Sequence, residues 1–139
     1  MKFLTTVAAA AVLFAGAAGA GDVANGEKVF NQRCKTCHAI VDPSGKEVVK
    51  GGKTGPNQWA LIGSKAGRDA EFTRYGPSLK AAGEKGLVWT EETVASYLED
   101  PRDFLRAYLG DDKARSNMAY KLPDAAARAD VAAYLATMK

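Results

Sequence analysis

Residues 33–40, RCKTCHAI, contain both cysteines and the single histidine of the 139-residue chain. Cys34, Cys37 and His38 form a C-x-x-C-H motif within five consecutive positions. The chain's most reactive side chains are therefore gathered in one short segment. The chemistry of this motif decides how the rest of the sequence is interpreted.

Three kinds of site are compatible with the motif. A redox dithiol needs only the two cysteines. A structural zinc site ordinarily takes four ligands, and the chain has no further Cys or His to complete one. Attachment of a c-type haem has C-x-x-C-H as its signature, with the sulfurs bonded to the porphyrin and the histidine bound to iron. We favour the haem site and keep the dithiol and zinc sites as alternatives.

The N-terminal segment is typical of a secretory signal. Lys2 precedes an Ala-rich apolar run that ends in an A-x-A pattern at residues 18–20. We expect residues 1–20 to be removed, which leaves residues 21–139 as the mature domain. The run is short for a membrane span, so an uncleaved anchor is the alternative we favour less. Export to the periplasm fits the motif, because bacteria attach haem covalently outside the cytoplasm.

Length and charge narrow the classes of function. A chain of 139 residues corresponds to one domain. Its 19 basic and 16 acidic residues give a formal net charge of +3, without the strong basic excess of a nucleic-acid-binding protein. No second long apolar run follows the signal, so we expect no stable membrane insertion.

Apolar spacing predicts an all-α fold. A first helix leads directly into the motif, and Gly26 within it predicts close approach of another helix, since glycine costs about 1 kcal/mol relative to alanine there. Thr90 is predicted to cap a second helix, and Asp100 a third that ends before Gly110. A last helix in residues 123–138 carries one apolar stripe, formed by Ala127, Val131, Tyr134, Leu135 and Met138.

The chain offers a second axial ligand for a low-spin haem. His38 is the only histidine, so methionine is the usual alternative, and it raises the reduction potential. Of the three methionines, Met1 lies in the signal and Met138 on the apolar stripe. Met118 lies in a polar loop between two helices, so we predict it as the ligand.

An acceptor is also needed for the second ring nitrogen of His38, since metal-bound histidines nearly always donate that N–H. The segment KTGPN, residues 53–57, follows the motif after one loop. We predict the carbonyl of Pro56 as the acceptor. Without a haem, the same segment would be interpreted as an ordinary Gly-Pro turn.

The sequence resembles a class I cytochrome c of the soluble bacterial cytochrome c2 and c-550 type. The matching segments follow one another through the mature chain: GDVANGEKVFNQRCKTCH, KTGPN, WTEETVASYLEDP, NM and ADVAAYL. The resemblance implies a single-domain fold with three main helices, plus short helices and loops, wrapped around one covalently bound haem. It also implies that Gly26 and Phe30 meet Val131 and Tyr134 where the first and last helices cross.

The resemblance further implies a role for each matching residue at the haem. Cys34 and Cys37 are implied as thioether links, and His38 and Met118 as axial ligands. Beyond these four, Pro56 is implied as the histidine's acceptor, Trp89 and Tyr75 as donors to the propionates, and Tyr97 as a neighbour of the methionine sulfur.

An electron carrier rather than an enzyme is implied, because both axial positions are filled. The implied electron donor is a bc1-type complex, and the implied acceptor is an oxidase, a reductase or a photosynthetic reaction centre. The protein itself is expected to be a monomer. A positive rim at the exposed haem edge is expected for docking, formed by Arg33, Lys35, Lys53, Lys113 and Lys121. The alternative is a haem protein with a labile sixth ligand, such as a small peroxidase or gas-binding module.

Two local departures from the family pattern lie near the predicted haem. Gln58 follows TGPN where the family usually has leucine. Ser64, followed by Lys65, stands where the family often has an arginine near a propionate.

Overall fold

The computed structural model describes residues 20–139. Residues 1–19, and with them almost all of the predicted signal, lie outside the described residues. Within residues 20–139 the chain forms five α-helices, one π-helical turn and two short strands. In chain order these are α1 (Val23–Val29), η1 (Phe30–Cys34), β1 (Ile40–Val41), β2 (Glu47–Val49), α2 (Pro77–Glu84), α3 (Glu91–Glu99), α4 (Pro101–Leu109) and α5 (Ala125–Ala136).

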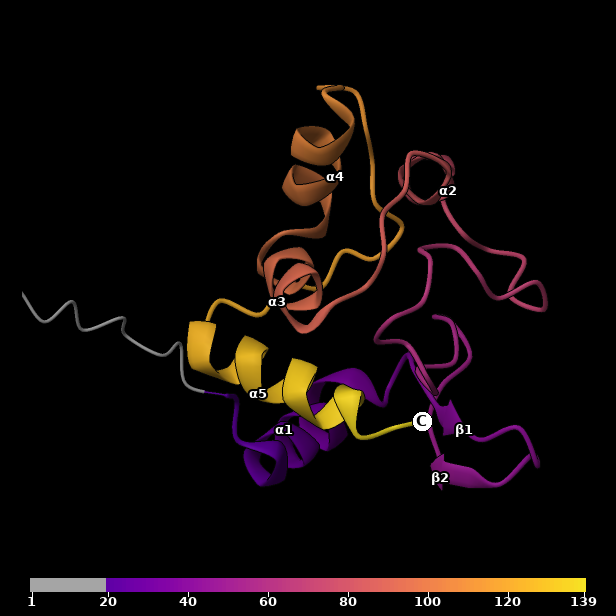
Figure 1. The fold of residues 1–139 in the computed structure, drawn as a ribbon, viewed down its shortest axis with the longest axis vertical. Helices are drawn as coiled ribbons and strands as arrows, with labels where there is room; N and C mark the ends of the chain where they lie inside the picture. Colours follow the sequence, from indigo (N-terminus) through magenta and orange to yellow (C-terminus); the bar gives the residue numbers. More distant parts are fainter. Residues whose placement is uncertain (1–19) are drawn as a thin grey trace, which may run out of the picture.

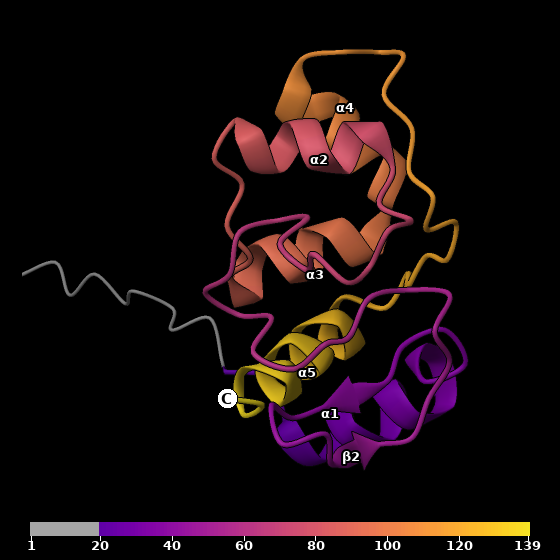
Figure 2. The same cartoon turned by 90° about the vertical axis from the view of Figure 1, so that its right-hand side faces the viewer.

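The helices form a stack that is clearest in Figure 2: α2 and α4 lie at one end, followed by α3, then α5, then α1. Contacts between α2 and α4, α3 and α4, α3 and α5, and α1 and α5 connect the stack. Figure 1 shows α5 lying across α1, so the first and last helices of the described chain pack against each other. Among the described residues, no helix is both long and apolar enough to cross a membrane.

The predicted crossing of the first and last helices is confirmed. A Cβ at Gly26 would lie only 2.0 Å from the carbonyl oxygen of Asp130 on α5, so the backbones touch where glycine has no side chain. The rings of Phe30 and Tyr134 lie 5.8 Å apart at the same crossing. This contact fixes the position of η1, which leads into the C-x-x-C-H motif.

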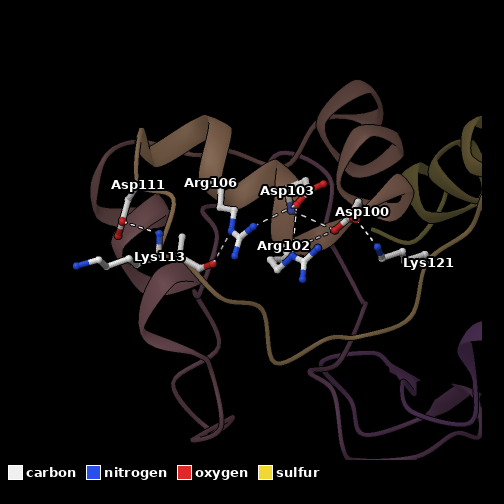
Figure 3. Close-up of polar contacts among 8 residues, drawn as sticks. Asp100, Arg102, Asp103, Arg106, Asp111, Lys113 and Lys121 are labelled. Carbon is white, nitrogen blue, oxygen red and sulfur yellow. Dashed lines mark hydrogen bonds and ion pairs between the residues drawn. The ribbon is translucent and has the colours of Figure 1, made fainter.

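The predicted helix ends are also found. The Thr90 side chain accepts the backbone N–H of Thr93, and the Thr93 side chain accepts the backbone N–H of Thr90. The two bonds form a capping box at the start of α3. Asp100 separates α3 from α4, and its carboxylate accepts the N–H groups of Arg102 and Asp103. Figure 3 shows that the same carboxylate also contacts Lys121, from the segment that leads into α5. Gly110 ends α4 in the left-handed conformation, with φ 65°.

One small element was not predicted. β1 and β2 form an antiparallel hairpin in which Ile40 pairs with Val49. Two strands of two and three residues are too short for a recognisable alternation. The hairpin leaves the helical fold class unchanged but orders the chain after the motif: the Asn57 amide binds both the N–H and the carbonyl of Val41, at 2.9 and 2.8 Å.

Candidate cofactor site

A cavity of about 540 Å³ lies against the C-x-x-C-H motif. This volume is within the usual range for cofactor sites. Its walls come from the motif, the turn at residues 54–58, the loop at residues 115–120, and α3 and α5. All eight residues predicted to contact a cofactor line it: Cys34, Cys37, His38, Pro56, Tyr75, Trp89, Tyr97 and Met118.

The motif itself forms a tight turn at the end of η1. The N–H groups of Cys37 and His38 both donate to the carbonyl of Cys34, each at 3.0 Å. No disulfide joins the two cysteines; Cys34 is buried and Cys37 is exposed. Burial, and secondarily the neighbouring Cys37, raises the pKa of Cys34 to about 11.

Three glycines allow the loop after the hairpin to lie directly on this turn, which sequence reasoning missed. A Cβ at Gly51 would lie 2.1 Å from the carbonyl oxygen of His38, and a Cβ at Gly52 would lie 2.0 Å from that of Thr36. A Cβ at Gly55 would lie 2.2 Å from Cε1 of the His38 ring. The Gly-Gly pair in the sequence is the signal that could have indicated this close approach.

His38 is oriented by this loop. Its Nδ1 donates to the carbonyl oxygen of Pro56 at 2.8 Å, which leaves Nε2 as the nitrogen with a lone pair. Burial lowers the pKa of His38 below its usual value, and the bond to Pro56 partly opposes this. The imidazole is therefore neutral at neutral pH, which is the form that binds metals.

Gln58 reaches the same pair of groups. Its side chain is buried, with Nε2 2.9 Å from the carbonyl oxygen of Pro56 and 3.1 Å from Nδ1 of His38. The polar residue that departs from the family pattern is thus satisfied by hydrogen bonding instead of disturbing the packing.

The Met118 loop is fastened to two helices. The Oγ of Ser116 accepts the Met118 N–H at 3.1 Å and lies 3.1 Å from the hydroxyl of Tyr97 on α3. The Arg115 N–H donates to Ser78 Oγ on α2 at 3.0 Å. The thioether is therefore presented to the cavity by a loop with several anchors, of which Ser116 was not predicted.

The predicted aromatic residues lie in the walls of the cavity. The Trp89 and Tyr97 ring centroids are 5.0 Å apart in an edge-on arrangement. The Tyr75 hydroxyl accepts the N–H of Asp69 at 3.3 Å, so its own hydrogen is available to another acceptor. Burial raises the pKa of both tyrosines, which keeps both hydroxyls neutral.

The charged residues that line the cavity are all basic: Arg33, Lys65, Arg68, Arg74 and Arg115. Arg33 was predicted at the haem edge and Lys65 was noted beside the propionate position, but Arg68, Arg74 and Arg115 were not predicted, because they are scattered through loops. Ser64 does not line the cavity, and its Oγ donates to the carbonyl of Leu61 at 2.5 Å.

The other predicted docking residues, Lys35, Lys53, Lys113 and Lys121, are exposed but are not among the residues that line the cavity. One of them, Lys121, is ion-paired with Asp100.

The donor set fits a c-type haem. Two thiols, one neutral imidazole and one thioether meet at a single cavity, and these are the groups that attach and ligate such a haem. The basic residues at the same cavity suit the two carboxylates of a porphyrin's propionates.

Curated relatives match nearly the whole chain. It is 50% identical over 135 residues to cytochrome c2 of Rhodobacter capsulatus, covering 97% of this chain and 96% of the relative. It is 55% identical over 118 residues to cytochrome c-551 of Roseobacter denitrificans, covering 85% of this chain and 81% of the relative. No family model matches the chain.

Solved structures agree with these matches. The structure of cytochrome c2 from Rhodobacter capsulatus superimposes with a TM-score of 0.79 at 51% identity, covering 84% of this chain and 97% of that one. The structure of cytochrome c2 from Rhodobacter sphaeroides gives a TM-score of 0.82 at 45% identity, and the match covers 85% of this chain and 96% of that one.

Proposed function

This chain belongs to the cytochrome c2 and c-550 family of class I cytochromes c, and it is an electron carrier with a covalently attached haem c rather than an enzyme. From this premise we propose that it shuttles single electrons in the periplasm, with His38 and Met118 as axial ligands. Its partners in this proposal are a bc1-type donor and an oxidase, reductase or photosynthetic reaction centre as acceptor. When bound, the haem supplies the one-electron ferric–ferrous couple.

The observation that carries this proposal is the meeting of His38 and Met118, 80 residues apart in the chain, at the cavity that also holds Cys34 and Cys37. Both residues are held by their own neighbours: the His38 imidazole by the Pro56 carbonyl, and the Met118 backbone N–H by Ser116. Ligands fixed in this way need little rearrangement when the iron changes charge. Fixed ligands at both axial positions also favour electron transfer over substrate binding at iron.

Residues of the cavity are assigned further roles in this proposal. Cys34 and Cys37 form the thioether links, while Tyr75 and Trp89 donate to the propionates. Their position in the cavity wall supports this, as does the neutral hydroxyl of Tyr75.

Docking is proposed at the positively charged mouth of the cavity. The five basic residues that line it support this, together with exposed Lys35 within the motif and exposed Lys53 in the loop after the hairpin. A positive surface attracts an acidic partner and raises the association rate more than the affinity of the bound state. Lys113 and Lys121 lie on the chain on either side of Met118 and complete the proposed rim.

Export is proposed from the N-terminal sequence. Residues 1–20 act as a cleaved signal in this proposal, and haem attachment follows in the periplasm. Edman or mass analysis of the purified protein tests it: a mature N-terminus at Gly21 is expected, and a retained Met1 would contradict it.

Visible spectra of the purified holoprotein test the ligand assignment. We expect a low-spin ferric form with the weak long-wavelength charge-transfer band of methionine–iron ligation, and a sharp reduced spectrum typical of c-type haem. A high-spin ferric spectrum would instead indicate a labile sixth position, as in a small peroxidase or gas-binding module. A colourless protein would exclude the haem site altogether.

A further inference from the structure

Gln58 forms a triangle of polar atoms with the histidine of the motif. The Pro56 carbonyl oxygen lies 2.8 Å from His38 Nδ1 and 2.9 Å from Gln58 Nε2, and the two nitrogens are 3.1 Å apart. The Gln58 side chain is 8% exposed. Its amide is thus held next to the histidine ring within the protein, away from competing water.

Only one hydrogen-bonding pattern suits the triangle. A carbonyl can only accept, so Nδ1 of His38 carries a hydrogen and donates it to Pro56. Nδ1 then has no lone pair for Gln58, whose amide N–H must donate to the second lone pair of the same oxygen. The opposite orientation of the amide would place two acceptor oxygens 2.9 Å apart.

We propose that Gln58 is a positioning residue that raises the reduction potential by withdrawing part of the Pro56 carbonyl from His38. This inference rests on the proposed ligation of iron by His38 and goes beyond it. A carbonyl that serves two donors is a weaker acceptor for each of them. The amide hydrogens also lie beside Nδ1–H and repel its partial positive charge.

The direction follows from how the acceptor acts on the ring. A strong acceptor on Nδ1–H makes the imidazole more basic, and a more basic ligand favours the ferric ion. Weakening that acceptor therefore favours the ferrous ion. Removing the Gln58 amide should strengthen the bond between His38 and Pro56, so the reduction potential should fall.

The test uses the ferric and ferrous holoprotein with two variants, Gln58→Met and Gln58→Leu. Both variants remove the amide N–H that Gln58 donates to the Pro56 carbonyl. Gln58→Leu is measured in place of Gln58→Met if the latter does not fold. We expect the equilibrium constant for reduction by a fixed donor to fall roughly two- to fivefold, the scale of one hydrogen bond. We also expect the His38 Nδ1–H proton resonance of the ferrous protein to move downfield, which loss of packing alone would not cause.

Asn57→Ala is the matched control. Asn57 holds the same turn through Val41, and its hydrogen bonds do not involve His38 or the Pro56 carbonyl. It should lower the melting temperature without the resonance shift. An unchanged or higher potential in both Gln58 variants, with the methionine charge-transfer band retained, would overturn this inference alone. Absence of His and Met ligation in the unsubstituted protein would overturn the ligand assignment, and this inference with it.

Discussion

The hydroxyl of Tyr97 lies 3.1 Å from the Oγ of Ser116, which also accepts the backbone N–H of Met118 at 3.1 Å. One serine therefore links a buried aromatic residue of α3 to the loop that presents the thioether. The family resemblance implied Tyr97 as a neighbour of the methionine sulfur, and in the structure its hydroxyl contacts the Met118 loop through Ser116. The geometry predicts that the strength of methionine ligation depends on Ser116.

Ser116→Ala should loosen the Met118 loop, because it leaves the Tyr97 hydroxyl and the Met118 N–H without this partner. We expect the ferric protein to bind added imidazole several-fold more tightly, since a lost hydrogen bond of about 1 kcal/mol corresponds to about fivefold. Spectrophotometric titration measures this affinity. Ser96→Ala, at an exposed position on α3, is the matched control. Equal affinities in all three proteins would show that Ser116 does not restrain the ligand.

Met118→Ala should leave the haem attached, because the thioether links do not involve it. The ferric spectrum should lose its methionine–iron charge-transfer band, and the potential should fall because a thioether favours the ferrous state. Met138→Ala is the control. Met138 is half-buried at the edge of the core, so this change should keep the band and lower the free energy of unfolding by roughly 1–3 kcal/mol. Survival of the band in Met118→Ala would transfer the ligand role to Met138.

Stability at acid pH should depend on Asp100. The contact with Lys121 is the main cause that lowers the pKa of the Asp100 carboxyl below its usual value, and the contacts with the N-terminus of α4 lower it further. A lowered folded-state pKa stabilises the protein above the unfolded pKa of about 3.9, and this contribution is lost as pH falls through the folded pKa.

Asp100→Asn tests this prediction, because asparagine keeps the helix cap and removes the charge. The variant should be less stable than the unsubstituted protein between pH 5 and 7, and the difference should vanish as the pH falls below the folded pKa. Denaturant unfolding across this pH range measures it. Lys121→Gln should give a smaller difference in the same direction, because the contacts of Asp100 with the N-terminus of α4 remain, and a difference that does not vary with pH would exclude the ion pair as the cause.

Electron transfer to an acidic partner should slow as salt rises, because attraction between surface charges is screened over about 8 Å at physiological ionic strength. At low salt, Lys53→Glu should slow the reaction several-fold, while Lys139→Glu at the chain end should do little. Lys121→Glu is expected to slow it as well, by less than Lys53→Glu because Lys121 is already paired with Asp100. Stopped-flow kinetics measure these rates. Equal effects at all three positions would argue against a docking face at the cavity mouth.

Sequence alone determined the features that depend on residue identity or on neighbours within one helical turn. With one histidine, two cysteines in C-x-x-C-H order and one methionine outside both the signal and the apolar stripe, few ligand sets were open. Thr90 and Asp100 begin α3 and α4, and Gly110 ends α4, through contacts within two to four residues. The crossing at Gly26 was also predictable, because a glycine inside a helix indicates close packing.

Tertiary structure alone decided several other meetings of distant side chains. Gln58 shares the Pro56 carbonyl with a histidine 20 positions earlier, and Ser116 meets Tyr97 across 19 positions. Arg74 and Arg115 reach one cavity from separate loops. No local spacing encodes such contacts, because side chains far apart in the chain become neighbours only when the helices pack and close the loops between them. The proposed ligands, and Pro56 as the acceptor of His38, were indicated by the sequence, whereas Gln58 and Ser116 beside them emerged only from the fold.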